Sequence, residues 1–424
     1  MRPTIYLKRI FLTFVICTTS FSAFSQLSFQ ATLDSGKREF RRQHALYESD
    51  FNLSVQLLSE AVRLQPNNAE ARYFLGYALD KLNIDDANMM AVTILETTIR
   101  ASEQFEAVNR LEPKYKGELV RLDPYSKLTA VWGSQAFSYL NNNKRDSALW
   151  ALKEGKRRGG FLQSVLEYCR LILKQCKKDA VLITKGDNIT FSVLYLQEVE
   201  GLRPDVVAVD GIMMGAAWYA NYIKKTKPLI ITHSEESIDT TEYLHWEPKA
   251  VSIVSKGNNT QTFSWLLKPT YFEEYILRND WMLMDILQHN GAARTFYFTA
   301  PSDSSYNLFL TDHLLNHGVV EELITEDGKI ADFATFPSNV FKEFSLEDIP
   351  LSDLTKSPDA LNLINYIRIA YLSNSLYLAG QNKFKESKEL LQKMEQKLPV
   401  DKLPHADEAY EKYYKDVKSY IKSD

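Results

Sequence analysis

The sequence predicts a protein that combines two structural classes: paired helical repeats, then a mainly parallel α/β sheet domain, then a C-terminal helical hairpin. A helical spacing recurs before residue 177, and short β-branched runs alternate with helical patterns over residues 178–356. Helical periodicity then returns from residue 357 to the end. With residues 1–25 interpreted as a signal peptide, the predicted domains are 26–177, 178–356 and 357–424.

The composition is that of a globular protein. Of the 424 residues, 45% are hydrophobic and 25% are charged, which excludes a wholly disordered, collagen-like or polytopic membrane chain. Lys and Arg total 50 against 54 for Asp and Glu, a net charge of -4. Because nucleic-acid binders usually carry a basic excess, no nucleic-acid partner is expected.

The N-terminus has the pattern of a secretory signal. Three basic residues precede an apolar run over 10–17, and Ala23 and Ser25 are the small residues that favour cleavage between Ser25 and Gln26. The run is shorter than the ~20 residues of a membrane span, and no other stretch is apolar enough to form one. We therefore expect an exported chain, in the periplasm or on a periplasm-facing envelope surface, with no transmembrane span after cleavage.

A helical spacing recurs four times before and after the predicted sheet domain. Each copy has a small residue, a large apolar residue at +4, a small or apolar residue at +7 and a helix breaker at +12; the copies begin at Ser54, Ala101, Ala148 and Ser387. The first three positions lie on one helix face. The pattern resembles the second helix of a tetratricopeptide repeat, and Leu75-Gly76 fits the first helix. Such repeats usually bind polypeptides, although ordinary amphipathic helices can share the spacing by chance.

Between the repeats and the C-terminal helices, five short apolar runs predict strands: 179–184, 204–210, 228–232, 294–300 and 319–325. Helical patterns separate them, over 191–200, 215–223, 272–289 and 308–316. The alternation predicts an α/β sheet that is mainly parallel. Residues 233–270 indicate an insertion with short strands around Ala250–Val254, and Ser357-Pro358-Asp359 predicts a helix start.

The usual catalytic motifs are missing. The sequence has no GxGxxG, GxxxxGK[ST], GxSxG or HExxH, so no catalytic residue, cofactor or metal is predicted. His313 and His317 are four residues apart, but a solvated or capping role is favoured over a metal site. Cys169 and Cys176 lie ~10.5 Å apart along one helix, too far for a disulfide, and are expected to be buried free thiols.

One polar segment is the candidate ligand-binding site. Lys185, Asp187, Asn188 and Thr190 follow the strand at 179–184 and precede a helix, and Asp210 follows another strand. The carboxyl ends of parallel strands form the binding crevice of an α/β sheet, so these five residues are predicted to share it. The alternative is helix capping, which accounts for every residue in the segment except Lys185.

The segment KGDNITFSVLYLQEVEGLRPDVVAVD (185–210) resembles the soluble C-terminal region of bacterial membrane glycosyltransferases related to protein O-mannosyltransferases, of the Bacteroidota type. YILRNDWMLMDILQHNGAARTFYF (275–298) and LPVDKLPH (398–405) extend the resemblance, which spans about 178–410. This chain has Ile189 where the family has a second Asp, and Ser192 where it has Pro. The resemblance implies a relative of the accessory region without the membrane-embedded catalytic portion.

Three functions are compatible with this sequence. The favoured hypothesis is an exported, non-catalytic protein-binding subunit or scaffold of a bacterial cell-envelope complex that binds an envelope protein through the repeats. The first alternative is a glycan- or acceptor-binding accessory protein in envelope protein O-glycosylation, with a saccharide as ligand. The second is a hydrolase or transferase that uses Asp187 and Asp210 at the strand ends.

Overall fold

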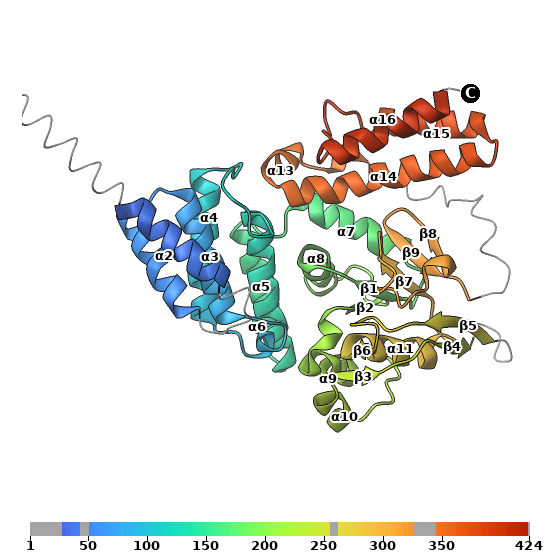
Figure 1. Ribbon diagram of the computed structural model, residues 1–424, viewed down its shortest axis with the longest axis horizontal. Helices are drawn as coiled ribbons and strands as arrows, with labels where there is room; N and C mark the ends of the chain where they lie inside the picture. Colours follow the sequence, from blue (N-terminus) through green and yellow to red (C-terminus); the bar gives the residue numbers. More distant parts are fainter. Residues whose placement is uncertain (1–27, 43–50, 255–261, 326–344, 423–424) are drawn as a thin grey trace, which may run out of the picture. The chain divides into compact units, whose positions relative to one another are not determined.

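The computed structural model describes residues 28–42, 51–254, 262–325 and 345–422 (Figure 1). The chain divides into two units, one of Met1–Met89 with Thr93–Val120 and one of Met90–Val92 with Arg121–Asp424. This division falls near residue 120, whereas the sequence suggested a boundary at 177. The predicted signal peptide, with its cleavage site, lies outside the described residues.

The first unit is helical. It contains a helix over 28–42, followed by α2 (Asn52–Leu64), α3 (Ala69–Asn83) and α4 (Leu95–Leu111). The first three positions of both spacing copies here, beginning at Ser54 and Ala101, are buried. A Cβ on Gly76 would lie 2.8 Å from the ring of Phe105, so the glycine of the Leu-Gly pair allows α3 to approach α4 closely. The recurrent spacing therefore marks the packed faces of helices.

The second unit has helices before and after its sheet. They are α5 (Pro124–Asn141), α6 (Arg145–Arg157), α7 (Gln163–Gln175), and later α13 (Leu351–Lys356), α14 (Pro358–Gly380), α15 (Phe384–Lys397) and α16 (Glu408–Lys422). The copies beginning at Ala148 and Ser387 are buried against α5 and α14. Ser357 caps α14 as predicted, its hydroxyl accepting a hydrogen bond from the backbone N–H of Ala360.

A five-stranded sheet forms the α/β part of this unit. Its strands are β1 (Val181–Thr184), β2 (Val207–Asp210), β7 (Phe296–Thr299), β8 (Leu314–Asn316) and β9 (Val320–Leu323), in the order β2-β1-β7-β9-β8. β1 pairs in parallel with β2 and with β7, whereas β9 is antiparallel to both of its neighbours. The α/β class is confirmed, with the parallel pairing confined to β2-β1-β7. β1 and β7 are buried throughout, as continuous apolar runs require, and β9 is buried although it contains Glu321 and Glu322.

Two predicted elements are wrong. Residues 228–232 form no strand, because side chains of α11 (Arg278–Asn290) take their backbone groups: Asn290 bonds both N–H and C=O of Ile230, and Asp285 accepts from Thr232. Residues 308–316 are not a helix but a short 3-10 turn, η3 (Thr311–His313), and strand β8. His313 and His317 therefore do not share a helix face.

The remaining elements connect the sheet. α8 (Asp187–Glu198) links β1 to β2, and η2 (Met213–Gly215), α9 (Ala217–Thr226), α10 (Glu235–Thr240) and α11 lie between β2 and β7. β4 (Lys249–Val254) lies where short strands were predicted and pairs antiparallel with β5 (Thr262–Leu267). β3 (Tyr243–His245) pairs with β6 (Tyr275–Leu277) in a separate ribbon. A short 3-10 turn, η5 (Leu346–Asp348), precedes α13.

Candidate functional site

The parallel strands place a cavity at the point where the sheet topology reverses. From the carboxyl end of β1 the chain runs to β2 on one side, and from that of β7 it runs to β8 and β9 on the other. Ligands of open α/β sheets bind at such a switch point. A cavity of 360 Å³ lies there, lined by residues 185–189 after β1, 299–301 after β7, and Asp359, Asn362 and Tyr366 of α14. We call it the switch-point cavity.

The first wall of this cavity is the start of α8. Gly186 precedes the helix with a φ of 88°, a conformation that favours glycine, and its carbonyl accepts hydrogen bonds from Ile189 and Thr190. Asp187 and Asn188 form the first turn. The Asn188 amide donates to the hydroxyl of Ser126 on α5 at 2.9 Å. Three of the five predicted site residues, Lys185, Asp187 and Asn188, therefore line one cavity.

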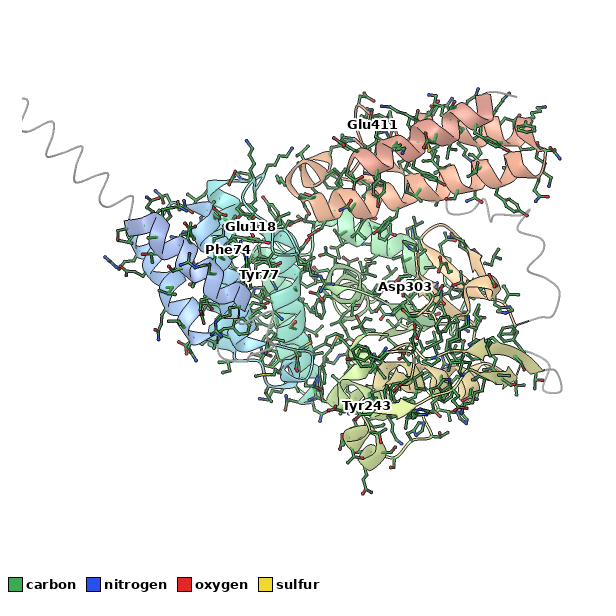
Figure 2. All side chains as sticks on the ribbon, in the orientation of Figure 1. Phe74, Tyr77, Glu118, Tyr243, Asp303 and Glu411 are labelled. Atoms are coloured by element: carbon green, nitrogen blue, oxygen red, sulfur yellow. The ribbon has the colours of Figure 1, made fainter. Side chains whose placement is uncertain are left out.

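Lys185 forms an ion pair at the rim. Its Nζ lies 2.5 Å from Oδ2 of Asp303 and 4.8 Å from the centre of the Tyr306 ring, and Figure 2 labels Asp303. Burial alone would raise the pKa of Asp303, but hydrogen bonds from Lys185, the Tyr306 backbone and Ser305 lower it to about 2. Both partners of the pair are about half exposed. The lysine and the aspartate therefore remain within reach of a ligand.

Thr190 and Asp210 lie away from this cavity, in the interior. Thr190 donates to one carboxylate oxygen of Asp210, and the backbone N–H groups of Ile212 and Met213 donate to the other, at 2.9 and 2.8 Å. Burial raises the pKa of Asp210 to about 6, although these hydrogen bonds oppose the shift. The adjoining void of 20 Å³ holds about one water molecule. The structure therefore separates these two residues from the other three and favours a structural role for them.

The cavity also depends on a contact that sequence reasoning missed. Asp123 and Asp359 cap the starts of α5 and α14 reciprocally: the Asp123 N–H donates to Asp359 at 2.9 Å, and the Asp359 N–H donates to Asp123 at 3.2 Å. Ser357 donates its hydroxyl to Asp123 as well. Burial and the nearby Asp359 carboxylate raise the pKa of Asp123. Both residues stand in capping motifs, but their pairing across 236 residues has no local signal.

A second hollow adjoins the switch-point cavity and shares Ala300, Pro301 and Tyr366 with it. Its volume is 530 Å³, and it lies between the β7–β8–β9 part of the sheet and helices α14 and α16. Four tyrosines line it, Tyr366, Tyr377, Tyr410 and Tyr413, and none of its described lining residues is charged. Tyr366 and Tyr410 hydrogen-bond to each other. We call this hollow the tyrosine groove.

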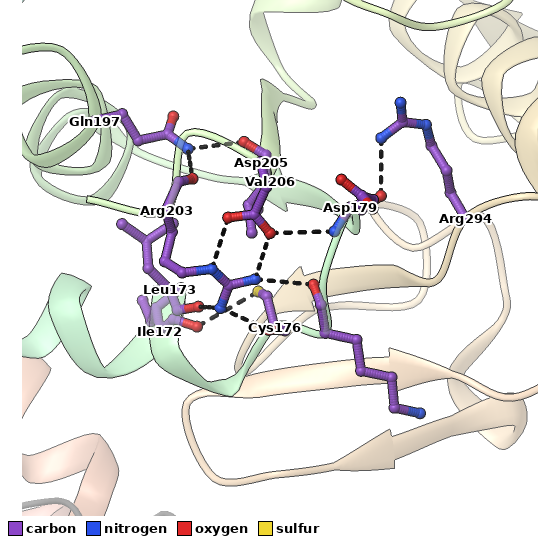
Figure 3. A network of polar contacts seen from close by, with 10 residues as sticks. Ile172, Leu173, Cys176, Asp179, Gln197, Arg203, Asp205, Val206 and Arg294 are labelled. Carbon is purple, nitrogen blue, oxygen red and sulfur yellow. Dashed lines mark hydrogen bonds and ion pairs between the residues drawn. The ribbon is translucent and has the colours of Figure 1, made fainter. Parts of the chain in front are cut away.

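Arg203 and Asp205, within the 185–210 segment, have a structural role (Figure 3). Arg203 donates to the carbonyls of Leu173 and Cys176 at the end of α7, both at 2.8 Å, and to that of Lys177 at 3.0 Å. It also binds both oxygens of Asp205 at 2.8 Å, and these hydrogen bonds lower the pKa of Asp205 to about 2. The Arg203 guanidinium therefore caps the C-terminal carbonyls of α7 and links them to the loop before β2.

The described residues contain no group of three or more His, Cys, Asp or Glu placed to hold a metal ion. Cys169 and Cys176 are buried and free, as predicted, and burial raises the pKa of both thiols. Across the described ranges, no helix combines the length and apolar character needed to cross a membrane. The lining of the switch-point cavity provides carboxylate, ammonium, guanidinium, amide and tyrosine groups.

Residues 166–245 match a family model described as TMEM260-associated domain 2. This domain is linked to an O-mannosyltransferase-like glycosyltransferase family, which agrees with the resemblance seen in the sequence. The matched segment runs from α7 to β3 and includes one wall of the switch-point cavity and the Arg203 network. It covers less than half of the chain, and comparison with curated proteins gives no match.

Proposed function

We propose that this protein is an exported, non-catalytic binding subunit of a bacterial cell-envelope complex, of the kind found in Bacteroidota. In this role its tetratricopeptide-like helices and its α/β part hold an envelope protein. The observation that carries the proposal is the tyrosine groove, a hollow of 530 Å³ beside a helix pair with the repeat spacing.

The lining of the groove favours an uncharged polypeptide segment as its occupant. The tyrosine rings offer flat apolar surface with a polar tip, a combination that is enriched at protein interfaces. Asn316, Ser373 and Asn374 add groups that can pair with peptide N–H and C=O. A charged segment would lose its hydration in this groove without gaining an opposite charge.

The test compares two tryptophan substitutions on α16. Ala409 lines the groove and is exposed, so Ala409→Trp fills it, whereas Glu408→Trp adds the same side chain next to it but outside the lining. Tagged wild-type and variant chains are purified from gently solubilised native envelope after in vivo cross-linking. We expect one stoichiometric partner with the wild type and with Glu408→Trp, and its loss with Ala409→Trp.

Recovery of the same proteins with all three chains would refute the groove as the binding surface. Recovery of the chain alone in every case would refute the subunit proposal. Equal melting temperatures for the two variants serve as the folding control, because both substitutions lie on the exposed side of one helix turn.

The switch-point cavity supports a second candidate, a saccharide-binding accessory protein in envelope O-glycosylation. Its lining balances Arg121 and Lys185 against Asp187 and Asp359 and adds the amides of Asn188 and Asn362, a set that suits neutral hydroxyl groups. Calorimetric titration with methyl glycosides should show heat for the wild type and for Asp312→Asn, an exposed control, but none for Asp187→Asn. No heat for any of the three would exclude this candidate.

A further inference from the structure

An exposed aromatic surface lies on the ribbon of β3 and β6, apart from the residues of the groove and the cavity. All three residues of β3 are exposed, and Tyr243 retains 58% of its accessible surface (Figures 1 and 2). In the turn that leads into β6, Tyr271 is 44% and Phe272 is 76% exposed. We call Tyr243, His245, Tyr271, Phe272 and Tyr275 the aromatic ribbon.

The rings of this ribbon form two contacting groups, which the backbone bridge between Tyr271 and Tyr275 joins. Tyr275 lies opposite His245 in the strand register and is bridged to Tyr271, so the three side chains share a face of the ribbon. The ring of Tyr275 is 5.3 Å from that of Tyr243 and 5.8 Å from that of His245. The rings of Tyr271 and Phe272 are 4.2 Å apart. The ribbon therefore carries two neighbouring sets of aromatic rings, whose flat faces suit contact with a partner.

The turn holds Phe272 outward at a conformational cost. Phe272 and Glu273 have φ values of 47° and 59°, the left-handed region that is unfavourable for residues with a side chain. Two hydrogen bonds of 3.0 Å between the backbones of Tyr271 and Tyr275 close the turn. At the base of the turn, the backbone N–H of Trp246 donates to the Glu274 carbonyl at 2.8 Å, and the Trp246 side chain is buried. Phe272 adds nothing to the core because it is exposed, so its outward position points to contact with a partner.

Carboxylates surround the aromatic ribbon. Glu242 precedes β3, Glu247 follows it, and Glu273 and Glu274 stand in the turn, all four exposed or half exposed. Glu274 raises the pKa of Tyr275 through its charge and a hydrogen bond. Three described cations near the ribbon have partners of their own: Lys249 lies 3.7 Å from the centre of the Trp246 ring and Lys268 lies 5.7 Å from that of Phe309. Arg278 is buried and donates to the Gly215 carbonyl at 2.6 Å.

We propose that the aromatic ribbon is a docking surface for a basic polypeptide segment rich in arginine or lysine. Guanidinium and ammonium groups are attracted to tyrosine and phenylalanine faces, and the surrounding glutamates supply the opposite charge. An anionic membrane would be repelled by the same glutamates. The occupant differs from the uncharged segment proposed for the tyrosine groove, and the ribbon docks it whether or not the groove is occupied.

The experiment measures fluorescence anisotropy of labelled nona-arginine with the full chain at two salt concentrations. The decisive variants, Phe272→Ser and Tyr243→Ser, keep every charge of the protein, so they separate ring contacts from general attraction to an acidic chain. Each should weaken binding by about fivefold, the effect of a cation–π contact of about 1 kcal/mol. Tyr420→Ser, which removes a ring that is 46% exposed on α16, should bind as the wild type does.

Two further arms complete the test. Phe272→Gly suits a φ of 47°, so it should leave the melting temperature unchanged or higher while weakening nona-arginine binding as Phe272→Ser does. Equal binding by the wild type and the ring variants would overturn the proposal, and so would no binding by the wild type. Flotation of the wild type with phosphatidylcholine vesicles, lost in Phe272→Ser, would also overturn it in favour of a membrane surface.

Discussion

The crossing of α5 and α8 provides a stringent test of the fold around the switch-point cavity. Gly133 of α5 faces Phe191 of α8, and a Cβ on this glycine would lie 2.1 Å from Cγ of the ring and 2.5 and 2.6 Å from its Cδ atoms. Carbon atoms in contact prefer about 3.5–4.0 Å, so Gly133→Ala requires a shift of about 1.5 Å. The ring is 1% exposed and packs on Phe137 at 5.4 Å, so it has little room to move.

Overpacking of a core costs about 1–3 kcal/mol, and the short distances here place Gly133→Ala near the upper value. For a domain of this size that corresponds to a loss of roughly 5 °C or more in melting temperature, measured by circular dichroism. Gly215→Ala is the matched control, because its Cβ would meet no atom closer than 3.8 Å. We expect that variant to melt within about 2 °C of the wild type, which corresponds to less than 1 kcal/mol.

A double-mutant cycle identifies the contact. In a Phe191→Leu background the smaller side chain makes room for the new methyl group, so Gly133→Ala should cost at least about 1 kcal/mol less than in the wild type. Equal costs in both backgrounds, or a cost no greater than that of Gly215→Ala, would show that α5 does not cross α8 at this distance. The result bears on the site, because α8 carries Asp187 and Asn188.

Three other outcomes follow from the buried polar groups and thiols. Arg203→Ala should lower the free energy of unfolding by about 3 kcal/mol in urea titrations, because it removes five hydrogen bonds to carboxylate or carbonyl groups. Arg294→Ala is the control: it removes two exposed hydrogen bonds and should lower the free energy of unfolding by under about 1 kcal/mol. The pKa of Asp205 is lowered to about 2, so its contribution is present above the unfolded value near 4 and is lost as the pH falls from about 4 towards 2. The stability difference between the wild type and Asp205→Asn should therefore shrink over that range, and a constant difference would contradict the assignment. Cys169 and Cys176 should resist a thiol reagent until urea unfolds the chain, as followed by mass spectrometry at the two positions, and labelling of the native state would contradict their burial.

The parts of the fold that the sequence predicts are those with a local cause. The repeat spacing identifies buried helix faces because a face is read within four to seven residues, and β1, β2 and β7 stand out as short apolar runs. The segment 228–232 has the same composition as those strands. It fails to become one because Asn290 and Asp285, more than 50 residues away, satisfy its backbone groups. A local sequence pattern does not show that distant side chains will take the hydrogen bonds that a neighbouring strand would otherwise make.

The candidate site divides in the same way. Lys185, Asp187 and Asn188 line one cavity because they follow one another in the loop between β1 and α8. The opposite wall comes from α14, which the reciprocal caps of Asp123 and Asp359 hold across a separation of 236 residues. Asp210 also follows a strand, yet its carboxylate turns inward to bind the next loop.

The family match and the surfaces proposed for binding fall on different parts of the chain. Within 166–245, Arg203 and Asp205 join α7 to the loop before β2, so these two residues of the matched segment stabilise a connection. The tyrosine groove is built from residues after 299, and of the aromatic ribbon only Tyr243 and His245 fall inside the match. The match holds only β1 and β2 of the five-stranded sheet, so it gives no information on the surfaces proposed for binding after residue 245. Substitutions in the groove and in the ribbon, rather than in the matched segment, are the ones that should separate binding from folding.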